Sequence, residues 1–547
     1  MGKIMKNNKI ESNNVAQYFS KNLQQVGFSS PTKAVLTTIK ESVDNSLDAC
    51  EDAGILPTLD LKVEKMGPGA SKNTELVKVV VVDNGPGIEE EDISKVFGQF
   101  LASSKFGRGR CSRGQQGIGI SAATAQAQQT NSRGAVVISK TKKMKKAIRC
   151  IVEVDTKNNT GILKNIENIS WDRESGVSVE FILEGKVQVN GESGLLTYIN
   201  GSALVNPHMT ISYTLPDSET VTIERVSDVC AIIPEATEPH PHTMKLGEFT
   251  SFSHLFQESS VSLWLRTAFS RVSDSTIKDI IKKDPSLKSV ISKKLESVKD
   301  EDIRALYSAI QGIELMAPST RSVLTIGEDA LSKSVKRLGD VDFFSVVTRK
   351  PTICDHKPVQ VEVAISRIEN SGKDSQIQVL RFANRVPLQF DKSACAIVKA
   401  IESVNWRAYG IEQSKESIPI GPYAIAVSIV SPFIKFKNAS KETIDASDEL
   451  IQEIRLALIQ AGQKLSKFVK KEAKAAELEA KIRHMEQFSP ILVKSLIGIS
   501  KEPKSRRKNL EIGLKKILGR DTNELEAELQ KAEKTLDQQI ERDDYEA

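Results

Sequence analysis

The sequence predicts an α+β protein built from several domains, and three observations lead to that prediction. The chain has 547 residues, which is enough for about three or four domains at roughly 150 residues each. Hydrophobic residues make up 39% of the chain, so it can bury several cores. Helix-like and strand-like segments alternate up to about residue 225, and the proline-rich connector IIPEATEPHPH then marks a change of composition.

Periodicity places the predicted elements in order along the chain. A helix is expected at 33–50, a buried strand at 79–82, and further strands at 135–139 and 150–154. The block after the connector reads as helical to about 315, and the following block mixes three strands with a helix, at 342–348, 359–366, 377–384 and 393–404. From about 443 to the end the chain is charged and compatible with helix.

Composition and charge narrow the functional class. A net charge of +5 neither demands nor excludes nucleic acid, so any basic surface must be local. No apolar run is long enough to span a bilayer, and the polar start has no signal-peptide core. The six cysteines are scattered and form no CxxC pair, which favours a reducing cytoplasm and argues against structural zinc.

The predicted helix 33–50 carries a first candidate site. Its apolar residues gather on one side, while Glu41, Asp44, Asn45 and Asp48 gather on the other. Glu41 and Asn45 are four residues apart, so their side chains are neighbours. A carboxylate can accept a proton from attacking water, and an amide oxygen beside it suits magnesium. The alternative is an ordinary solvated polar face.

A second candidate site follows the strand at 79–82. Asp83 stands where this strand ends, in the string DNGPG, and glycines allow the backbone to approach a ligand closely. A carboxylate there could accept hydrogen bonds from an exocyclic amine such as that of adenine. The alternative is a loop whose Asn-Gly pair merely turns the chain.

A glycine-rich loop before a helix is the third candidate site. Gly114, Gly117 and Gly119 fit GxxGxG, and exposed amides at a helix start attract phosphate. A P-loop is excluded because no GxxxxGK string followed by Ser or Thr occurs. A Rossmann GxGxxA match is disfavoured, because RGQQ is not a buried strand and basic residues occupy the zone of the ribose-binding acid.

Together, ExxxN, DxGxG and GxxGxG in this order resemble the GHKL ATPase superfamily. That resemblance implies a Bergerat fold, a mixed sheet with helices on one face, and ATP bound between the sheet and a lid. The segments ESVDNSLDA, RGQQGIGISAA and RFANRVPLQFDKSACAIVKAIESVNWRAYG further resemble the family of archaeal topoisomerase VI B subunits, over about residues 15 to 470.

The resemblance implies four domains. These are an ATPase domain with an N-terminal dimerisation strap (1–228), a helix–two-turn–helix domain (229–315), an α+β transducer of ribosomal S5 domain 2-like type with the start of a stalk helix (316–470), and a charged helical extension that contacts a partner (471–547). It also implies ATP and Mg²⁺ as cofactors, ATP-driven homodimerisation, an A-subunit partner in an A2B2 assembly, duplex DNA as substrate, and a nucleoid-associated, cytoplasmic location.

The resemblance also implies roles for individual residues. Glu41 matches the general base for water, Asn45 the magnesium ligand, and Asp83 the residue that reads adenine, with Gly87 lining the base. The remaining implied nucleotide contacts are Asp48, Ser104, Lys105, Gly114, Gln115, Gln116, Gly117, Ile118, Gly119, Ile120 and Ser121.

One transducer lysine and one departure from the superfamily pattern complete the implied site. Lys441 matches the lysine that reaches the γ-phosphate, with Lys435 and Lys437 as neighbouring alternatives. One departure is Ser178, which stands in Gly-Val-Ser where the superfamily often has Gly-Thr; the hydroxyl contact is lost or Ser178 replaces it.

Trp406, Arg407 and Tyr409 resemble a DNA-contacting WKxY element with arginine in place of lysine. An arginine between aromatic rings can grip phosphate and stack. The alternative is that the two rings anchor the core.

Other features of the sequence limit the function. No strand-cleavage chemistry is visible, so DNA breakage is assigned to the partner. His240 and His242 lie in the connector without matching ligands, and we therefore expect no zinc site there. A GHKL chaperone-like or mismatch-repair-type ATPase, and a non-catalytic DNA scaffold, are the alternative functions.

Overall fold

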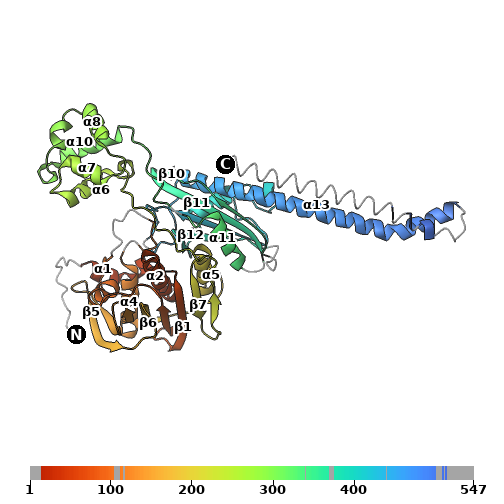
Figure 1. Cartoon of the computed structure of the whole chain (residues 1–547), viewed down its shortest axis with the longest axis horizontal. Helices are drawn as coiled ribbons and strands as arrows, with labels where there is room; N and C mark the ends of the chain where they lie inside the picture. Colours follow the sequence, from red (N-terminus) through yellow and green to blue (C-terminus); the bar gives the residue numbers. More distant parts are fainter. Residues whose placement is uncertain are drawn as a thin grey trace, which may run out of the picture. The chain divides into compact units, whose positions relative to one another are not determined.

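The computed structural model describes residues 14–103, 111–114, 117–323, 325–338, 341–368, 375–438, 440–500, 508–510, 512–513 and 516. Residues up to Gly462 form one compact unit, and Gln463 begins a second. The fold is mixed α and β, as the sequence predicts (Figure 1).

The first part of the chain is built on a mixed eight-stranded sheet. Its strand order is β5-β4-β3-β6-β2-β1-β7-β8. Strands β1 and β7 are parallel, and every other pair of neighbouring strands in the sheet is antiparallel. The strands are β1 Thr58–Pro68, β2 Glu75–Val82, β3 Ala135–Lys140, β4 Ala147–Asp155, β5 Thr160–Ile169, β6 Gly176–Gly185, β7 Thr210–Thr214 and β8 Val221–Ile223.

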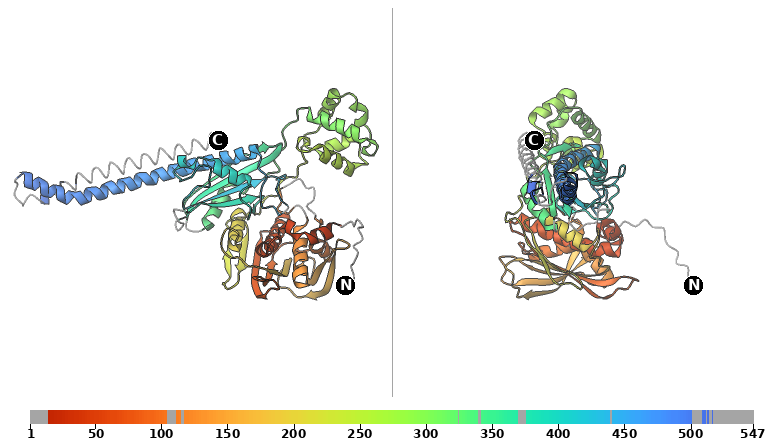
Figure 2. Two further views of the ribbon diagram at one scale, coloured as in Figure 1. Left: turned by 180° about the vertical axis from the view of Figure 1, so that it is seen from behind. Right: turned by 90° about the vertical axis from the view of Figure 1, so that its right-hand side faces the viewer.

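Helices cover one face of this sheet, as the side view in Figure 2 shows. They are α1 Val15–Lys21, α2 Pro31–Asp52, α3 Glu90–Gly98, α4 Gly119–Asn131 and α5 Leu195–Val205, with a short turn η1 at Leu23–Val26. Alternate residues of β2 are buried, and Val77, Val79 and Val81 are at most 1% exposed. The period of two therefore directs one set of side chains into the core beneath the helices.

Helix α2 forms where the sequence predicts it. Ser30 caps its first turn by accepting a hydrogen bond from the Lys33 backbone, and Pro31 supplies the favoured first helical residue. The predicted apolar side is buried, with Ile39 and Val43 fully inaccessible. The alternative of a solvated polar face is wrong, because Asp44 and Asp48 are each only 6% exposed.

A helical segment with its own core follows the connector. Its elements are η2 Pro241–Thr243, α6 Leu246–Ser253, η3 His254–Phe256, α7 Val261–Ala268, α8 Asp274–Lys283, α9 Leu287–Ile291, η4 Leu295–Ser297 and α10 Asp300–Gln311. The rings of Phe249, Trp264 and Phe269 meet at its centre, with Phe249 and Trp264 fully buried. Aromatic side chains bury large apolar areas, so these rings contribute strongly to the core of this segment.

A second sheet follows, with strand order β10-β11-β14-β12-β13 and β9 paired to β11. Strands β12 and β14 are parallel, and helix α12 connects them. The elements are α11 Glu328–Val335, η5 Lys336–Leu338, β9 Val341–Thr348, β10 Thr352–Cys354, β11 Lys357–Ile368, β12 Gln378–Ala383, β13 Val386–Pro387, α12 Ala396–Ser403, η6 Trp406–Tyr409, β14 Tyr423–Val430 and α13 Asp448–Ser500.

The long helix α13 contains Pro490 within its span. In the part that belongs to the second unit, several large apolar side chains are exposed, among them Phe488, Ile491 and Ile499. Among the described residues, no helix is both long enough and apolar enough to cross a membrane.

Candidate nucleotide-binding site

A cavity of about 300 Å³ lies beside α2, the loop after β2, and the start of α4. This volume falls in the range of small-molecule sites, at about 300–1,000 Å³. Its lining combines residues from all three sequence motifs with a lysine from far along the chain: Glu41, Asn45, Ser46, Asp83, Gly87, Gly114, Gly117, Ile118, Gly119, Ile120 and Lys441.

Glu41 lies directly against the first residue of α4. A Cβ atom placed on Gly119 would fall 1.7 Å from the Glu41 Oε2 atom, so a side chain there would require Glu41 to move. The carboxylate therefore lies at the start of a helix, where backbone amides and the helix dipole favour negative charge. The same position suits a phosphate group, so Glu41 and the amides can face the same ligand.

Asp83 is a buried acceptor at the end of β2. Its Oδ2 atom accepts a 2.7 Å hydrogen bond from the Ser46 hydroxyl, and its Oδ1 atom accepts from the backbone amides of Gly85 and Val177. Burial raises the pKa of Asp83, and these three hydrogen bonds oppose the rise. They also fix the orientation of the carboxylate in the cavity wall. Sequence reasoning did not identify Ser46 as its partner.

Two further glycines are fixed by close backbone contacts. Gly87 has a left-handed φ of 77°, and a Cβ there would lie 2.1 Å from the Lys140 carbonyl oxygen. Gly117 has a φ of 59°, and a Cβ there would lie 2.8 Å from the carbonyl oxygen of Ala102. Both positions therefore require glycine for the cavity wall to keep its shape.

Lys441 enters the cavity from the second sheet's domain. Its ammonium donates a 2.8 Å hydrogen bond to the carbonyl oxygen of Arg113, just before the glycine-rich turn. Burial lowers the pKa of Lys441, and the negative charge of Glu41 opposes that shift. Beside it, Glu442 forms a 2.8 Å ion pair with Lys33 at the start of α2. Of the three lysines considered from the sequence, Lys441 is the one that lines the cavity.

Several predicted site residues lie elsewhere. Ser121 is 1% exposed and its hydroxyl donates to the Gln99 carbonyl, so it secures α4 and does not line the cavity. Ser178 lies between Val177 and Val179, which both line the cavity, and the alternation of a strand turns its hydroxyl to the opposite face. The suggestion that Ser178 replaces the strand threonine is therefore wrong. Ser104, Lys105, Gln115 and Gln116 lie outside the described residues.

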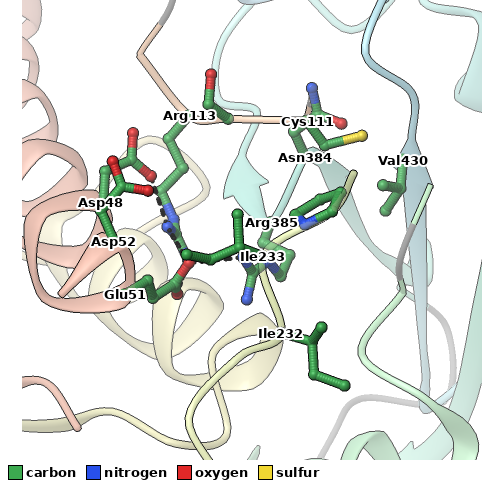
Figure 3. Close-up of a pocket in the computed structure, with 12 residues that line it drawn as sticks. Asp48, Glu51, Asp52, Cys111, Arg113, Ile232, Ile233, Asn384, Arg385 and Val430 are labelled. Carbon is green, nitrogen blue, oxygen red and sulfur yellow. Dashed lines mark hydrogen bonds and ion pairs between the residues drawn. The ribbon is translucent and has the colours of Figure 1, made fainter. Parts of the chain in front are cut away.

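Asp48 faces a buried ion cluster that the sequence did not reveal (Figure 3). The Arg113 guanidinium, whose side chain is 1% exposed, pairs with Asp48 and Glu51, each at 2.7 Å. Arg385, next to β12, pairs with the other oxygen of Glu51 at 2.7 Å. Glu51 thus joins α2, the residue before the glycine-rich turn, and the second sheet.

His208 supplies a third contact to Glu51, at 2.8 Å from its ring Nε2 atom. Burial by itself would raise the pKa of Glu51, but Arg113 and Arg385 outweigh it and hold that pKa well below its usual range. Burial also lowers the pKa of His208, which keeps the imidazole neutral near pH 7. The spacing of Asp44, Asp48 and Glu51 along one helix stripe was the available sequence signal.

The three residues of the predicted DNA element differ in exposure. Trp406 is fully buried, and its indole nitrogen donates to the Ile401 carbonyl at 2.8 Å. Its ring is therefore a structural anchor and cannot contact DNA from this position, which corrects that part of the prediction. Arg407 is exposed, with its Nε atom donating to the Gln413 carbonyl, and Tyr409 is half-buried against Gly462.

Comparisons with known proteins define first a class and then a family. Residues 32–157 match the family model described as histidine kinase-, DNA gyrase B-, and HSP90-like ATPase, so the first domain is an ATPase domain of this class. Residues 318–481 match the family model described as topoisomerase VI B subunit, transducer. The fold class predicted from the sequence is thereby confirmed.

Full-length relatives give the family. The B subunit of type 2 DNA topoisomerase 6 from Archaeoglobus fulgidus is 33% identical over 490 residues, covering 89% of this chain and 80% of that protein. Its counterpart from Pyrococcus abyssi is 30% identical over 571 residues, covering 96% and 98%. The chain belongs to the topoisomerase VI B subunit family. The solved B subunit of Myxococcus xanthus DNA gyrase aligns with a TM-score of 0.40 and 11% identity over 83% of this chain and 95% of that one, a likeness too distant to bear on function.

The ion cluster gives a first prediction. Replacing Glu51 with glutamine leaves Arg113 and Arg385 without their shared negative charge, and breaking a buried pair in this way costs about 3–5 kcal/mol. We expect Glu51→Gln to lower the melting temperature clearly and to weaken ATP binding. Glu64→Gln, which removes an exposed pair with Lys62, is the control and should shift stability by less than about 0.5 kcal/mol. Equal melting temperatures for the two variants would contradict the role of the cluster.

The pH dependence of stability gives a second prediction. Burial raises the pKa of Asp44 to about 7, with Lys40 opposing the shift and Glu41 adding to it. The unfolded chain loses this proton near pH 4 but the folded chain keeps it, so this group's contribution to stability falls as pH rises from about 4 to about 7. Asp44→Asn removes the loss and should stabilise the protein at pH 8 by at most about 4 kcal/mol, at 1.36 kcal/mol per pKa unit.

Melting temperatures at pH 5 and pH 8 test this expectation. The gain of Asp44→Asn over the unchanged protein should be larger at pH 8 than at pH 5. Exposed Asp172, replaced in the same way, should show no such difference. A gain that is the same at both pH values would show that Asp44 is ionised in the folded protein across this range.

Proposed function

We propose that this chain is the ATP-operated subunit of a DNA topoisomerase VI. ATP binding closes two copies of the chain around a DNA duplex, which then passes through a double-strand break made by the partner A subunit. The products are relaxed or decatenated DNA. The observation that carries the proposal is that Glu41, Asp83 and Lys441, from three distant segments, line one cavity.

The cavity supports one orientation of ATP. Asp83 accepts a hydrogen bond from the exocyclic amine of adenine, with Gly87 beside the base. The phosphates lie under the glycine-rich turn from Gly114 to the start of α4, where a side chain at Gly119 would collide with Glu41. Bare amides and the helix dipole stabilise the phosphate charge in that position. Ser104, Lys105, Gln115 and Gln116 are further proposed contacts, from the resemblance.

Glu41 and Lys441 carry the hydrolysis chemistry. Glu41 accepts a proton from the water that attacks the γ-phosphorus, and a positioned base of this kind contributes about 10²–10⁴-fold to a rate. Lys441 stabilises the negative charge that develops on the phosphoryl oxygens. The two groups carry opposite charges, so the Glu41 carboxylate favours the protonated form of Lys441.

Asn45 is the proposed magnesium ligand. Its side chain is half-buried and lines the same cavity as Glu41, one helical turn away, and an amide oxygen is a hard ligand that suits Mg²⁺. The ion supplies charge neutralisation for the phosphates when it is bound. Asn45 holds that position while Glu41 remains available for proton transfer.

Contacts between the two sheets' domains support coupling of nucleotide state to domain position. Lys441 bonds to the carbonyl of Arg113, Glu442 pairs with Lys33, and Arg385 pairs with Glu51. Lys441 belongs to one domain, and the terminal phosphate that it senses is bound by the other. The two domains can therefore adopt two arrangements, and ligand binding favours one of them. ATP therefore favours one arrangement of the domains, and its hydrolysis releases that arrangement.

The proposed domain limits are those expected from the sequence. The ATPase domain spans 1–228 and its N-terminal strap exchanges with a second copy on closure. The helix–two-turn–helix domain spans 229–315, the transducer 316–470, and the extension 471–547 contacts the A subunit in an A2B2 assembly. Exposed apolar side chains such as Phe488, Ile491 and Leu492 support a docking role for the extension.

Arg407 and Tyr409 are the proposed DNA contacts of the transducer. Trp406 fixes the short helix η6 from within, so the exposed guanidinium of Arg407 is presented at a defined place. Phosphate contacts of this kind hold a duplex in position without reading its sequence. Binding should therefore weaken as salt rises.

Paired variants of Glu41 and Lys441 test the nucleotide mechanism. Glu41→Ala should bind ATP with Mg²⁺ and close into a dimer, yet lose at least about 100-fold in turnover, because the base is gone. Lys441→Ala should bind ATP but close poorly, as measured by crosslinking between copies. Lys437→Ala is the matched control for Lys441. Full turnover by Glu41→Ala would refute the assignment of the base.

An Arg407 variant tests the DNA contact. Arg407→Ala should reduce DNA stimulation of ATP turnover several-fold and flatten its dependence on salt, because one phosphate contact is lost. Lys415→Ala changes another exposed basic side chain close in sequence and should leave both unchanged. Turnover without DNA should not change in either variant. A loss of the same size in both would mean that only general surface charge matters.

The whole proposal is tested by one reconstitution. The chain is mixed with an A subunit and supercoiled DNA, with ATP and with or without magnesium, and the topology of the DNA is read on a gel. Relaxation that needs both proteins, ATP and magnesium is the expected result. ATP turnover that responds to unfolded protein and not to DNA would overturn the proposal in favour of a chaperone-like ATPase.

A further inference from the structure

Three of the chain's six histidines meet where the helical segment adjoins the second sheet. His240 and His242 belong to the end of the connector, and His356 lies in the turn between β10 and β11. One ligand atom from each ring lies within 4.8 Å of the others. We propose that His240, His242 and His356 form a binding site for a transition-metal ion of the Zn²⁺ class.

The folded chain supplies the ligand that the connector lacks, contrary to the expectation from the sequence. The connector alone offers only two imidazoles, and two ligands do not make a metal site. The third imidazole comes from a hairpin far along the chain, so only the folded structure reveals the set. The rings are also close to one another, with centroids 5.1 Å apart for His240 and His242 and 5.4 Å apart for His242 and His356.

Hydrogen bonds prepare two of the rings for metal binding. The Nε2 atom of His240 lies 3.2 Å from the Met316 carbonyl oxygen, and that of His242 lies 3.0 Å from the Ile310 carbonyl oxygen. A carbonyl only accepts, so each Nε2 atom carries the proton and each Nδ1 atom keeps its lone pair. Histidines that bind zinc generally show this pairing, in which the ring nitrogen that does not bind the metal donates to a carbonyl or carboxylate. A metal ion bound to His240 Nδ1 would replace one long hydrogen bond, which the backbone amide of His242 donates to that atom at 3.3 Å.

His356 occupies an unusual backbone position. Asp355 and His356 form a two-residue hairpin loop, with left-handed φ values of 49° and 58°. Asparagine and glycine are favoured in such a loop, because other side chains pay a conformational cost there. The exposed His356 ring nevertheless stacks 5.9 Å from the ring of His240, with only 6° between their planes. A ligand role accounts for an imidazole at this position.

The charge state of the cluster also suits a metal. The Nδ1 atom of His240 accepts from the His242 amide, so that nitrogen carries a lone pair, as a metal ligand must. The positive charges of Arg271 and Lys357 disfavour a bound dication. The negative charges of Asp355 and Glu248 partly offset that of Lys357. Neutral imidazoles beside cations select ions that bind nitrogen strongly, such as Zn²⁺, Ni²⁺ or Cu²⁺, over Mg²⁺ and Ca²⁺.

Metal binding requires a modest rearrangement. Zinc–nitrogen bonds are about 2.0–2.1 Å long, so three bound nitrogens lie closer together than 4.8 Å. Rotation of the exposed His356 ring toward the two connector rings provides that closure. Three protein ligands leave a fourth position, which water can fill from the exposed side.

Such an ion would tie the helical segment to the second sheet. The same hairpin is already fixed to α13, because the Asp355 amide donates a 2.5 Å hydrogen bond to Glu449. The bound metal would therefore restrain the helical segment relative to the hairpin and the first turn of α13. This restraint does not depend on the nucleotide site, so its test is independent of ATP turnover.

The test is metal binding by the full, untagged chain, measured by calorimetry with Zn²⁺ and by visible absorption with Co²⁺. We expect one ion per chain, and a Co²⁺ spectrum typical of a four-coordinate site with three nitrogen ligands and one water. His356→Asn removes a ligand but keeps a residue that accepts the left-handed turn, and should weaken Zn²⁺ binding at least tenfold. His242→Gln should do the same. His254→Asn, an exposed histidine in the same helical segment, should have no effect.

A second readout reports the restraint itself. Zn²⁺ should slow protease cleavage in the connector at 232–239 in the unchanged chain and in His254→Asn, but not in His356→Asn. Melting curves without metal verify that each variant is folded. Binding of Zn²⁺ to His356→Asn and His242→Gln with the affinity of the unchanged chain, or no stoichiometric binding by the unchanged chain, would overturn the proposal.

Discussion

The buried carboxylate of Glu51 is the contact on which the arrangement of the candidate site depends. It lies at the end of α2 and accepts from two guanidiniums, one just before the glycine-rich turn and one beside β12 of the transducer. A lone buried charge is costly, so neither arginine can leave without destabilising the other groups. The position of the turn over the cavity is therefore linked to the position of the transducer through one side chain.

The same logic extends to the cavity itself. Lys441 bonds to the backbone of Arg113, so the residue that anchors the turn through its side chain also receives the transducer lysine through its carbonyl. Glu41, the proposed general base, lies so close to Gly119 that a side chain at position 119 would have to displace it. The proposed nucleotide contacts and proton transfer thus depend on a small set of residues that also join the two domains.

Much of this could be predicted from the sequence, and the failures have physical causes. Periodicity located α2, β2 and the transducer strands, because their apolar residues follow the period of their own secondary structure. The motifs around Glu41, Asp83 and Gly119 could be found because each is a short local string. The pairing of Glu51 with Arg385 could not, because no local pattern links residues from two domains. The orientation of Ser178 was available from strand alternation, since Val177 and Val179 share the opposite face. Trp406 shows the limit of motif transfer, because a ring within a DNA-contacting string is fully buried here.

The contact between Tyr409 and Gly462 has a consequence for genetics. The tyrosine ring fills the space where any side chain at position 462 would begin, with a Cβ there lying 2.7 Å from the ring. A larger residue at this point of α13 would displace the short helix that carries Arg407. Because Arg407 is a proposed DNA contact, we expect a screen for defective DNA binding to recover changes at Gly462, whose place is taken up by the Tyr409 ring. Such alleles would map a mechanical support of the transducer rather than its binding surface.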